Sequence, residues 1–104
     1  MATPERISLN DFVQLYNIEI QFIDKLTHYG LLTIENEENI SYIKYEQIPV
    51  VERYMRWHYD MDINMEGIEV IDRLLEEIRE LKKENKRLNS EIHYHRTIFQ
   101  IEEE

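Results

Sequence analysis

Between Ile71 and Phe99, apolar residues recur at alternating spacings of three and four residues. This heptad pattern is typical of a helix that packs lengthwise against another helix, because side chains at those spacings share one stripe. At a rise of about 1.5 Å per residue, the helix is roughly 50 Å long. The preceding residues are too few to cover that length. We therefore expect a second chain to cover part of the seam, which consists of Ile71, Leu74, Ile78, Leu81, Asn85, Leu88 and Ile92.

One polar residue, Asn85, occupies an a position of this pattern if Ile71 is also an a position. Asn85 either sets the register of a two-chain coiled coil or is a tolerated polar residue near solvent. A parallel pair would place the g-position residue Glu77 beside Lys82 of the other chain, whereas many antiparallel registers would bring glutamates together. Exposed ion pairs contribute little to stability, so these charges leave the orientation of the helices open.

The beginning of the chain predicts two short helices joined by a turn. Ser8 is a typical N-cap residue, and Asp11 stands where a capping-box acid stands, so a helix is expected over residues 9–16. Asn17 is the residue in the following turn that best tolerates a left-handed backbone. A second helix is expected over residues 20–29, ended by Gly30. Two helices joined by so short a turn predict a helix-turn-helix.

The residues after Gly30 predict a small β-hairpin wing and a third helix. Apolar residues alternate in residues 31–34 and 40–45, with a polar loop over residues 35–39 between them. A third helix is expected over residues 47–59, with Pro49 in its first turn. Asn64 then caps a long helix that begins at about Met65. The sequence therefore predicts a mainly α protein with a winged-helix head over residues 1–63 and a long helix over residues 64–104.

The composition limits the classes of function. The net charge of −10 repels phosphates and favours a basic partner. With no cysteine, no apolar run long enough to span a membrane and no basic-apolar leader, we expect a cytoplasmic protein. His93 and His95 lie two residues apart, hence on different faces of a helix, and neither a glycine-rich loop nor a nucleophile–base pair is present. We expect no catalysis, cofactor or metal.

Two parts of the sequence resemble known families when they are taken together. The helix-turn-helix that ends in Tyr29-Gly30-Leu31-Leu32, the hairpin, and the junction over residues 61–68 are similar to the winged-helix head of MerR-type proteins. The segment Leu81-Lys82-Lys83-Glu84-Asn85-Lys86-Arg87-Leu88 resembles the CbpM family of chaperone modulatory proteins. The resemblance covers about residues 8–92. It implies that the chain binds the J-domain of a DnaJ-like co-chaperone, of the curved-DNA-binding protein A type, and inhibits that co-chaperone.

The departures from DNA-binding MerR proteins concern charge. Asp24 and Lys25 stand where those regulators have Arg and Tyr in the recognition helix. The tip of the expected wing carries Glu35, Glu37 and Glu38 and no basic residue. Duplex DNA carries one charge per roughly 1.7 Å, so three acids at its backbone would oppose binding. Direct DNA binding is therefore not expected, and the same acids are candidates to attract the basic helix of a J-domain. The alternative is that the wing acids only make a soluble loop.

Tyr54 and Trp57 are the candidate apolar contacts for such a partner, because aromatic side chains often dominate binding energy. The alternative is that they pack the head against the long helix. Two other functions stay open at this stage. One is a dimeric transcription regulator that binds DNA, and the other is a structural dimer module with an unknown partner.

Overall fold

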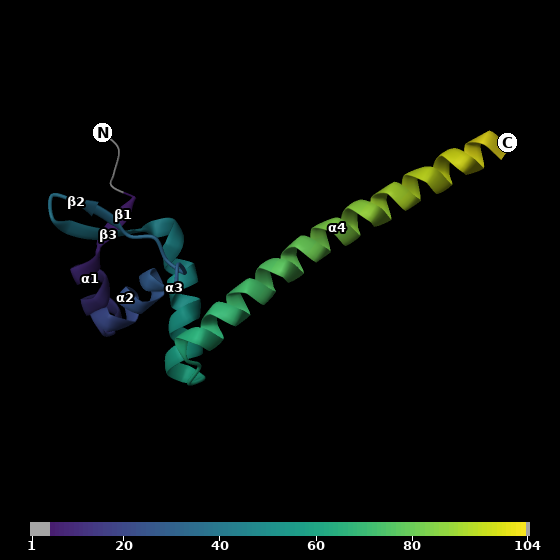
Figure 1. The fold of residues 1–104 in the computed structure, drawn as a ribbon. Helices are drawn as coiled ribbons and strands as arrows, with labels where there is room; N and C mark the ends of the chain where they lie inside the picture. The colour runs from purple at the N-terminus through teal and green to yellow at the C-terminus, as the bar shows by residue number, and fades with distance from the viewer. Residues whose placement is uncertain (1–4, 104) are drawn as a thin grey trace. The chain divides into compact units, whose positions relative to one another are not determined.

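The computed structural model describes residues 5–103 of the chain, with side chains up to Phe99. The chain forms two compact units, which divide between Glu69 and Val70. We call the first unit the head. Seven strands and α-helices follow one another along the described residues (Figure 1): β1 (Arg6–Ser8), α1 (Leu9–Tyr16), α2 (Ile20–His28), β2 (Glu35–Glu37), β3 (Ile40–Lys44), α3 (Ile48–Met55) and α4 (Met65–Glu103). A 3₁₀ turn, η1 (Tyr45–Gln47), precedes α3, and a π-helical turn, η2 (Arg56–Asp60), follows it.

The helix-turn-helix forms where the local signals predict it. The Ser8 side chain caps α1, because its Oγ accepts a hydrogen bond from the backbone N–H of Asp11 at 3.2 Å. Asn17 takes the left-handed conformation, with φ 53°, and ends α1. Helix α2 ends at His28, one residue earlier than predicted, and Gly30 follows with φ 74°. The predicted helix-turn-helix is confirmed.

The sheet differs from the predicted hairpin. It has three antiparallel strands in the order β1-β3-β2, so residues 6–8 supply a strand that the sequence did not reveal. Residues 31–34 are not a strand. This segment is apolar because it packs on the head: Leu32 is buried in the core, and Leu31 and Ile34 are partly buried against it. The expected five-residue loop is also wrong, because β2 begins at Glu35 and only Glu38 and Asn39 turn the chain. Both have positive φ, 51° and 66°, as a two-residue hairpin turn of type I′ requires.

The core of the head joins side chains from every helix and from the sheet. Helix α3 continues directly into η2, and together they cover residues 48–60, close to the predicted third helix over residues 47–59. Pro49 lies in the first turn of α3, as expected. Val51 and Tyr54 of α3 are buried in the core, and Ile48, Val50 and Met55 pack against it partly buried, whereas Pro49 and Glu52 are exposed. The buried apolar side chains are Leu9, Phe12, Phe22, Ile23, Leu26, Leu32, Ile43, Val51, Tyr54, Met65 and Ile68.

The first turn of α4 belongs to the head. Asp62 takes a left-handed conformation, with φ 57°, and ends the preceding helical run. Asn64 caps α4 as predicted, because its Oδ1 accepts a hydrogen bond from the backbone N–H of Gly67 at 2.8 Å. A Cβ at Gly67 would lie 2.7 Å from Cγ2 of Ile63, so a larger residue here would force the Ile63 side chain to shift. Met65 and Ile68 are buried in the core.

This packing predicts that Ile68→Ala destabilises the head. The Ile68 side chain is fully buried, so its truncation should lower the free energy of unfolding by about 2–5 kcal/mol. Ile40→Ala is the matched control, because Ile40 is 46% exposed, and it should cost clearly less. Urea unfolding followed by circular dichroism measures both variants. Equal losses for the two variants would show that the start of α4 does not pack in the core.

Candidate functional site

Helix α2, the recognition helix of the helix-turn-helix, presents a surface with little positive charge. Phe22, Ile23 and Leu26 point into the core, and Asp24 and Lys25 are exposed. Lys25 is the one lysine or arginine of α2. Asp24 makes no ion pair with any residue that the structure describes, so its charge is fully available to a partner. The structure places Asp24 on the surface, as a docking residue requires.

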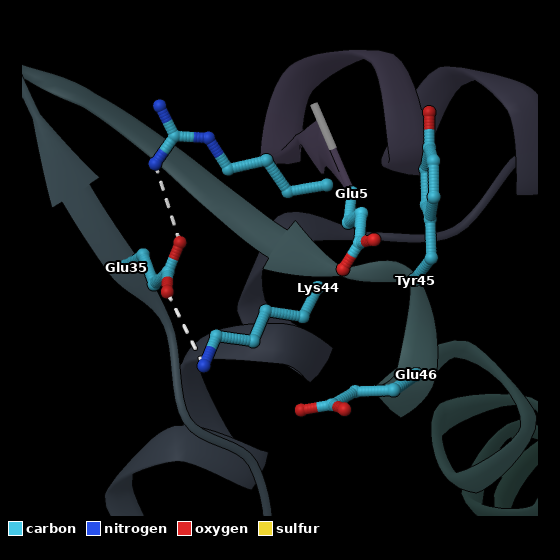
Figure 2. A pocket seen from close by; sticks show the side chains of 6 residues that line it. Glu5, Glu35, Lys44, Tyr45 and Glu46 are labelled. Atoms are coloured by element: carbon cyan, nitrogen blue, oxygen red, sulfur yellow. Dashed lines mark hydrogen bonds and ion pairs between the residues drawn. The ribbon is translucent and has the colours of Figure 1, made fainter. Parts of the chain in front are cut away.

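Two of the three acids of the wing, Glu35 and Glu37, lie beside basic side chains that the sequence analysis did not place there. Arg6, on β1, donates a hydrogen bond from Nη1 to Oε2 of Glu35 at 3.2 Å and also pairs with Glu37. The Nζ of Lys44 lies 3.4 Å from Oε1 of Glu35 (Figure 2). These partners, Arg6 first, hold the pKa of the Glu35 carboxyl below its usual value. Glu38, in the turn, has no ion pair among the described residues. The sequence expectation concerned only the tip of the wing, and the structure adds two cations, Arg6 and Lys44, beside Glu35.

A hollow of about 540 Å³ lies beside these ion pairs. Figure 2 shows Glu35 facing Lys44, with Glu5, Tyr45 and Glu46 on the other sides. Carboxylates outnumber cations here, and both cations are already bound to Glu35. An anionic ligand such as a phosphate would therefore be repelled. The hollow has the wrong charge for DNA backbone contacts and suits no anionic substrate.

The two candidate aromatic residues differ in their accessibility. Tyr54 is 2% exposed and belongs to the core, whereas Trp57 is partly buried against it. Their ring centroids are 5.9 Å apart, and the guanidinium of Arg53 lies 5.3 Å from the Trp57 ring centroid. A partner cannot reach Tyr54 without opening the head. The surface that we propose below therefore leaves Tyr54 out, whereas Trp57 keeps a partly exposed side chain.

A groove on the head has residues that the sequence reasoning missed. It holds about 390 Å³ and is lined by Tyr16, Asn17, Ile18, Glu52, Met55, Arg56, Tyr59 and Asp60. Tyr59 is 47% exposed, and its ring packs on that of Phe22 with centroids 5.2 Å apart. The hydroxyl of Tyr16 donates to Oε2 of Glu52 at 3.3 Å. Burial, and then the Glu52 carboxylate, raise the pKa of Tyr16. The π-helical turn, which orients Tyr59 and Asp60, has no clear sequence signal.

The seam of α4 is exposed along most of its length. The apolar residues Leu74, Ile78, Leu81, Leu88 and Ile92 are 42–67% exposed, and Asn85 is exposed among them. Ile71, at the start of the seam, is partly buried. Soluble monomers rarely present an apolar stripe of this length. The seam is a second candidate interaction surface, independent of the head.

The family comparison is consistent with this arrangement. Residues 7–90 match the model of the MerR HTH family regulatory protein. The chain belongs to this family. No curated protein and no solved structure matches the chain significantly. The family is one of regulatory proteins and not of enzymes. Among the described residues, no cluster of His, Cys, Asp or Glu side chains could hold a metal ion. No helix in that part of the chain is long and apolar enough to cross a membrane.

Proposed function

We propose that this MerR-family protein is a cytoplasmic dimer that binds the J-domain of a DnaJ-like co-chaperone and lowers the co-chaperone's activity with Hsp70. The resemblance of residues 81–88 to CbpM proteins suggests the partner. The surface charge of the head is the structural observation that supports it. A J-domain presents a basic helix to Hsp70, and an acidic surface is complementary to that helix.

The acidic charge is concentrated in the head. Residues 1–69 carry thirteen acidic and five basic side chains, a net charge of −8, whereas residues 70–104 carry nine and seven, a net charge of −2. Two of the five cations, Arg6 and Lys44, are bound to wing acids. The field of the head therefore attracts cationic partners over distances of about a Debye length, roughly 8 Å at physiological salt.

Within the head, Asp24 and Glu38 are the best candidates for attracting the partner. Neither carboxylate makes an ion pair among the described residues, so both charges are available. Glu35 and Glu37 lie beside Arg6, and reversing their charge would also disrupt the contacts between β1 and the wing. For the apolar contact, Tyr59 in the groove takes the place of the buried Tyr54.

The proposal predicts separate effects of charge and of the aromatic contact. In the double variant Asp24→Lys/Glu38→Lys, association with the J-domain should slow by about tenfold and depend less on salt, because electrostatic steering acts on the association rate. Tyr59→Ala should instead speed dissociation by about tenfold, as expected for an aromatic contact. Stopped-flow mixing measures both rates, and titration calorimetry measures the affinity.

Glu80→Lys is the matched control for the charge reversals. Glu80 is an exposed acid on α4, outside the head, and its reversal should leave association nearly unchanged. An absence of heat and of co-elution between the native protein and the J-domain would refute the proposed function. Binding that is insensitive both to the double charge reversal and to Tyr59→Ala would retain the partner but reject this surface.

The membership in a family of MerR regulators supports DNA binding as the second candidate function. The charges of α2 and of the wing turn oppose it, so the isolated protein should not retard duplex DNA at physiological salt. A gel-shift series with genomic duplexes tests this expectation. Retardation at nanomolar protein that weakens steeply as salt rises would favour the DNA-binding regulator over the J-domain binder.

A further inference from the structure

The groove beside Tyr59 combines aromatic and acidic side chains around one hollow. Its lining residues come from the end of α1, the turn after it, α3 and η2. Its volume of about 390 Å³ lies near the lower end of the roughly 300–1,000 Å³ that is typical of ligand pockets. A space of this size suits one long side chain of a partner better than a large organic ligand. The chemistry of the lining then decides which side chain fits.

Two carboxylates in the groove, those of Glu52 and Asp60, are available to a cation. Arg56 stands four residues from each along the chain, and it forms no ion pair with either in the part of the chain that the structure describes. The hydroxyl of Tyr16 donates a hydrogen bond to Oε2 of Glu52, which orients this carboxylate without neutralising its charge. Because two acids face one cation, the lining has a net negative charge and favours a cationic ligand.

The two tyrosine rings of the groove are held in place by the core. The ring centroid of Tyr16 lies 4.5 Å from that of Phe12, which is fully buried. The Tyr59 ring packs on the rings of Phe22 and His58, with centroids 5.2 Å and 4.9 Å away. Side chains that are already fixed lose little freedom when a ligand binds. Exposed tyrosine faces attract a guanidinium, which stacks on aromatic rings and is more weakly hydrated than an ammonium.

The wall of the groove that carries Tyr59 and Asp60 has an unusual backbone. Both residues belong to the π-helical turn η2, and Asp62, two residues further on, has a positive φ of 57°. Turns of the π-helix are rare and occur frequently at functional sites. A left-handed backbone at a residue other than glycine is also unfavourable and is found preferentially where a protein binds ligands. The backbone therefore marks the same wall of the groove as the side chains do.

We propose that this groove is a slot for an arginine side chain that projects from a basic protein partner. The guanidinium lies against the rings of Tyr16 and Tyr59 and pairs with the carboxylates of Glu52 and Asp60. Arginine suits the slot better than lysine, because its planar group both stacks on aromatic faces and donates several hydrogen bonds in a fixed geometry. The identity of the partner rests on the proposed J-domain function, whereas the chemistry of the slot does not.

Two small compounds test the slot directly in an NMR titration of the isotope-labelled chain. Acetyl-arginine methylamide carries the guanidinium, and acetyl-citrulline methylamide has nearly the same shape without the charge. The arginine compound should shift the backbone amide signals of residues 16–18 and 52–60. Its affinity should exceed that of the citrulline compound by at least about fivefold, because only the guanidinium forms charge-assisted hydrogen bonds with carboxylates.

The variants compare the groove with acids elsewhere on the head, and all five positions are exposed, so the fold should be kept. Glu52→Gln/Asp60→Asn should weaken binding of the arginine compound by at least about fivefold. Asp24→Asn/Glu38→Asn, the matched control, removes the same charge outside the groove and should change the affinity by less than about twofold. Arg56→Gln removes a like charge and should tighten binding by about twofold. Equal affinities of the two compounds, equal effects of the double variants, or weaker binding by Arg56→Gln would overturn the slot.

The J-domain separates the failure of the slot from the failure of the proposed function. In stopped-flow mixing, Glu52→Gln/Asp60→Asn should speed dissociation of the J-domain by about tenfold, because it leaves the charge of the inserted arginine unpaired. A J-domain that leaves the native chain and this variant at equal rates would overturn the slot as part of the interface and keep the proposed function. A native chain that selects the arginine compound but binds no J-domain would keep the slot and overturn the proposed function.

Discussion

The exposed apolar seam of α4 is the constraint on which the rest of the assembly depends. Fully burying a leucine or isoleucine side chain contributes about 1.5–3 kcal/mol, and most of the seam is half exposed or more in the single chain. A second helix can cover it along its whole length, whereas the head consists of short elements with their own core. Met65 and Ile68 tie the start of α4 into that core. In the proposed dimer, pairing of the seam brings two heads into one assembly and makes it bivalent for any partner that the heads bind.

The charges of the head serve two separate purposes. Arg6 and Lys44 form ion pairs with Glu35, and Arg6 also forms one with Glu37. These pairs link β1 and β3 to β2, the edge strand of the sheet. These exposed pairs fix the local geometry and contribute little to overall stability. Asp24 and Glu38 take no part in them. A winged-helix head with this distribution has the shape of a DNA reader, but its recognition helix carries no excess of positive charge and its wing turn carries Glu38. Such a surface attracts phosphates poorly and is complementary to the proposed basic partner.

Local signals made most of the helices predictable from the sequence. Ser8, Asn17, Gly30 and Asn64 each act on their own turn of the backbone, and each lies where the sequence analysis expected it. The strand β1 was missed because its stability comes from pairing with β3, far along the chain. The same non-local pairing brings Arg6 to the wing. The burial of Tyr54 was not predictable either, because α3 is apolar on several sides and only the packed head shows which sides are covered.

Sedimentation equilibrium of the full chain at micromolar concentration tests most directly whether a second copy covers the seam. The native chain should be a dimer. Leu81→Lys, which puts a charge into the seam, should be a monomer with a folded head. Ser90→Lys, which puts the same charge on the outward side of α4, should stay a dimer. A native chain that sediments as a monomer, or a dimer that Leu81→Lys leaves unchanged, would contradict the covered seam.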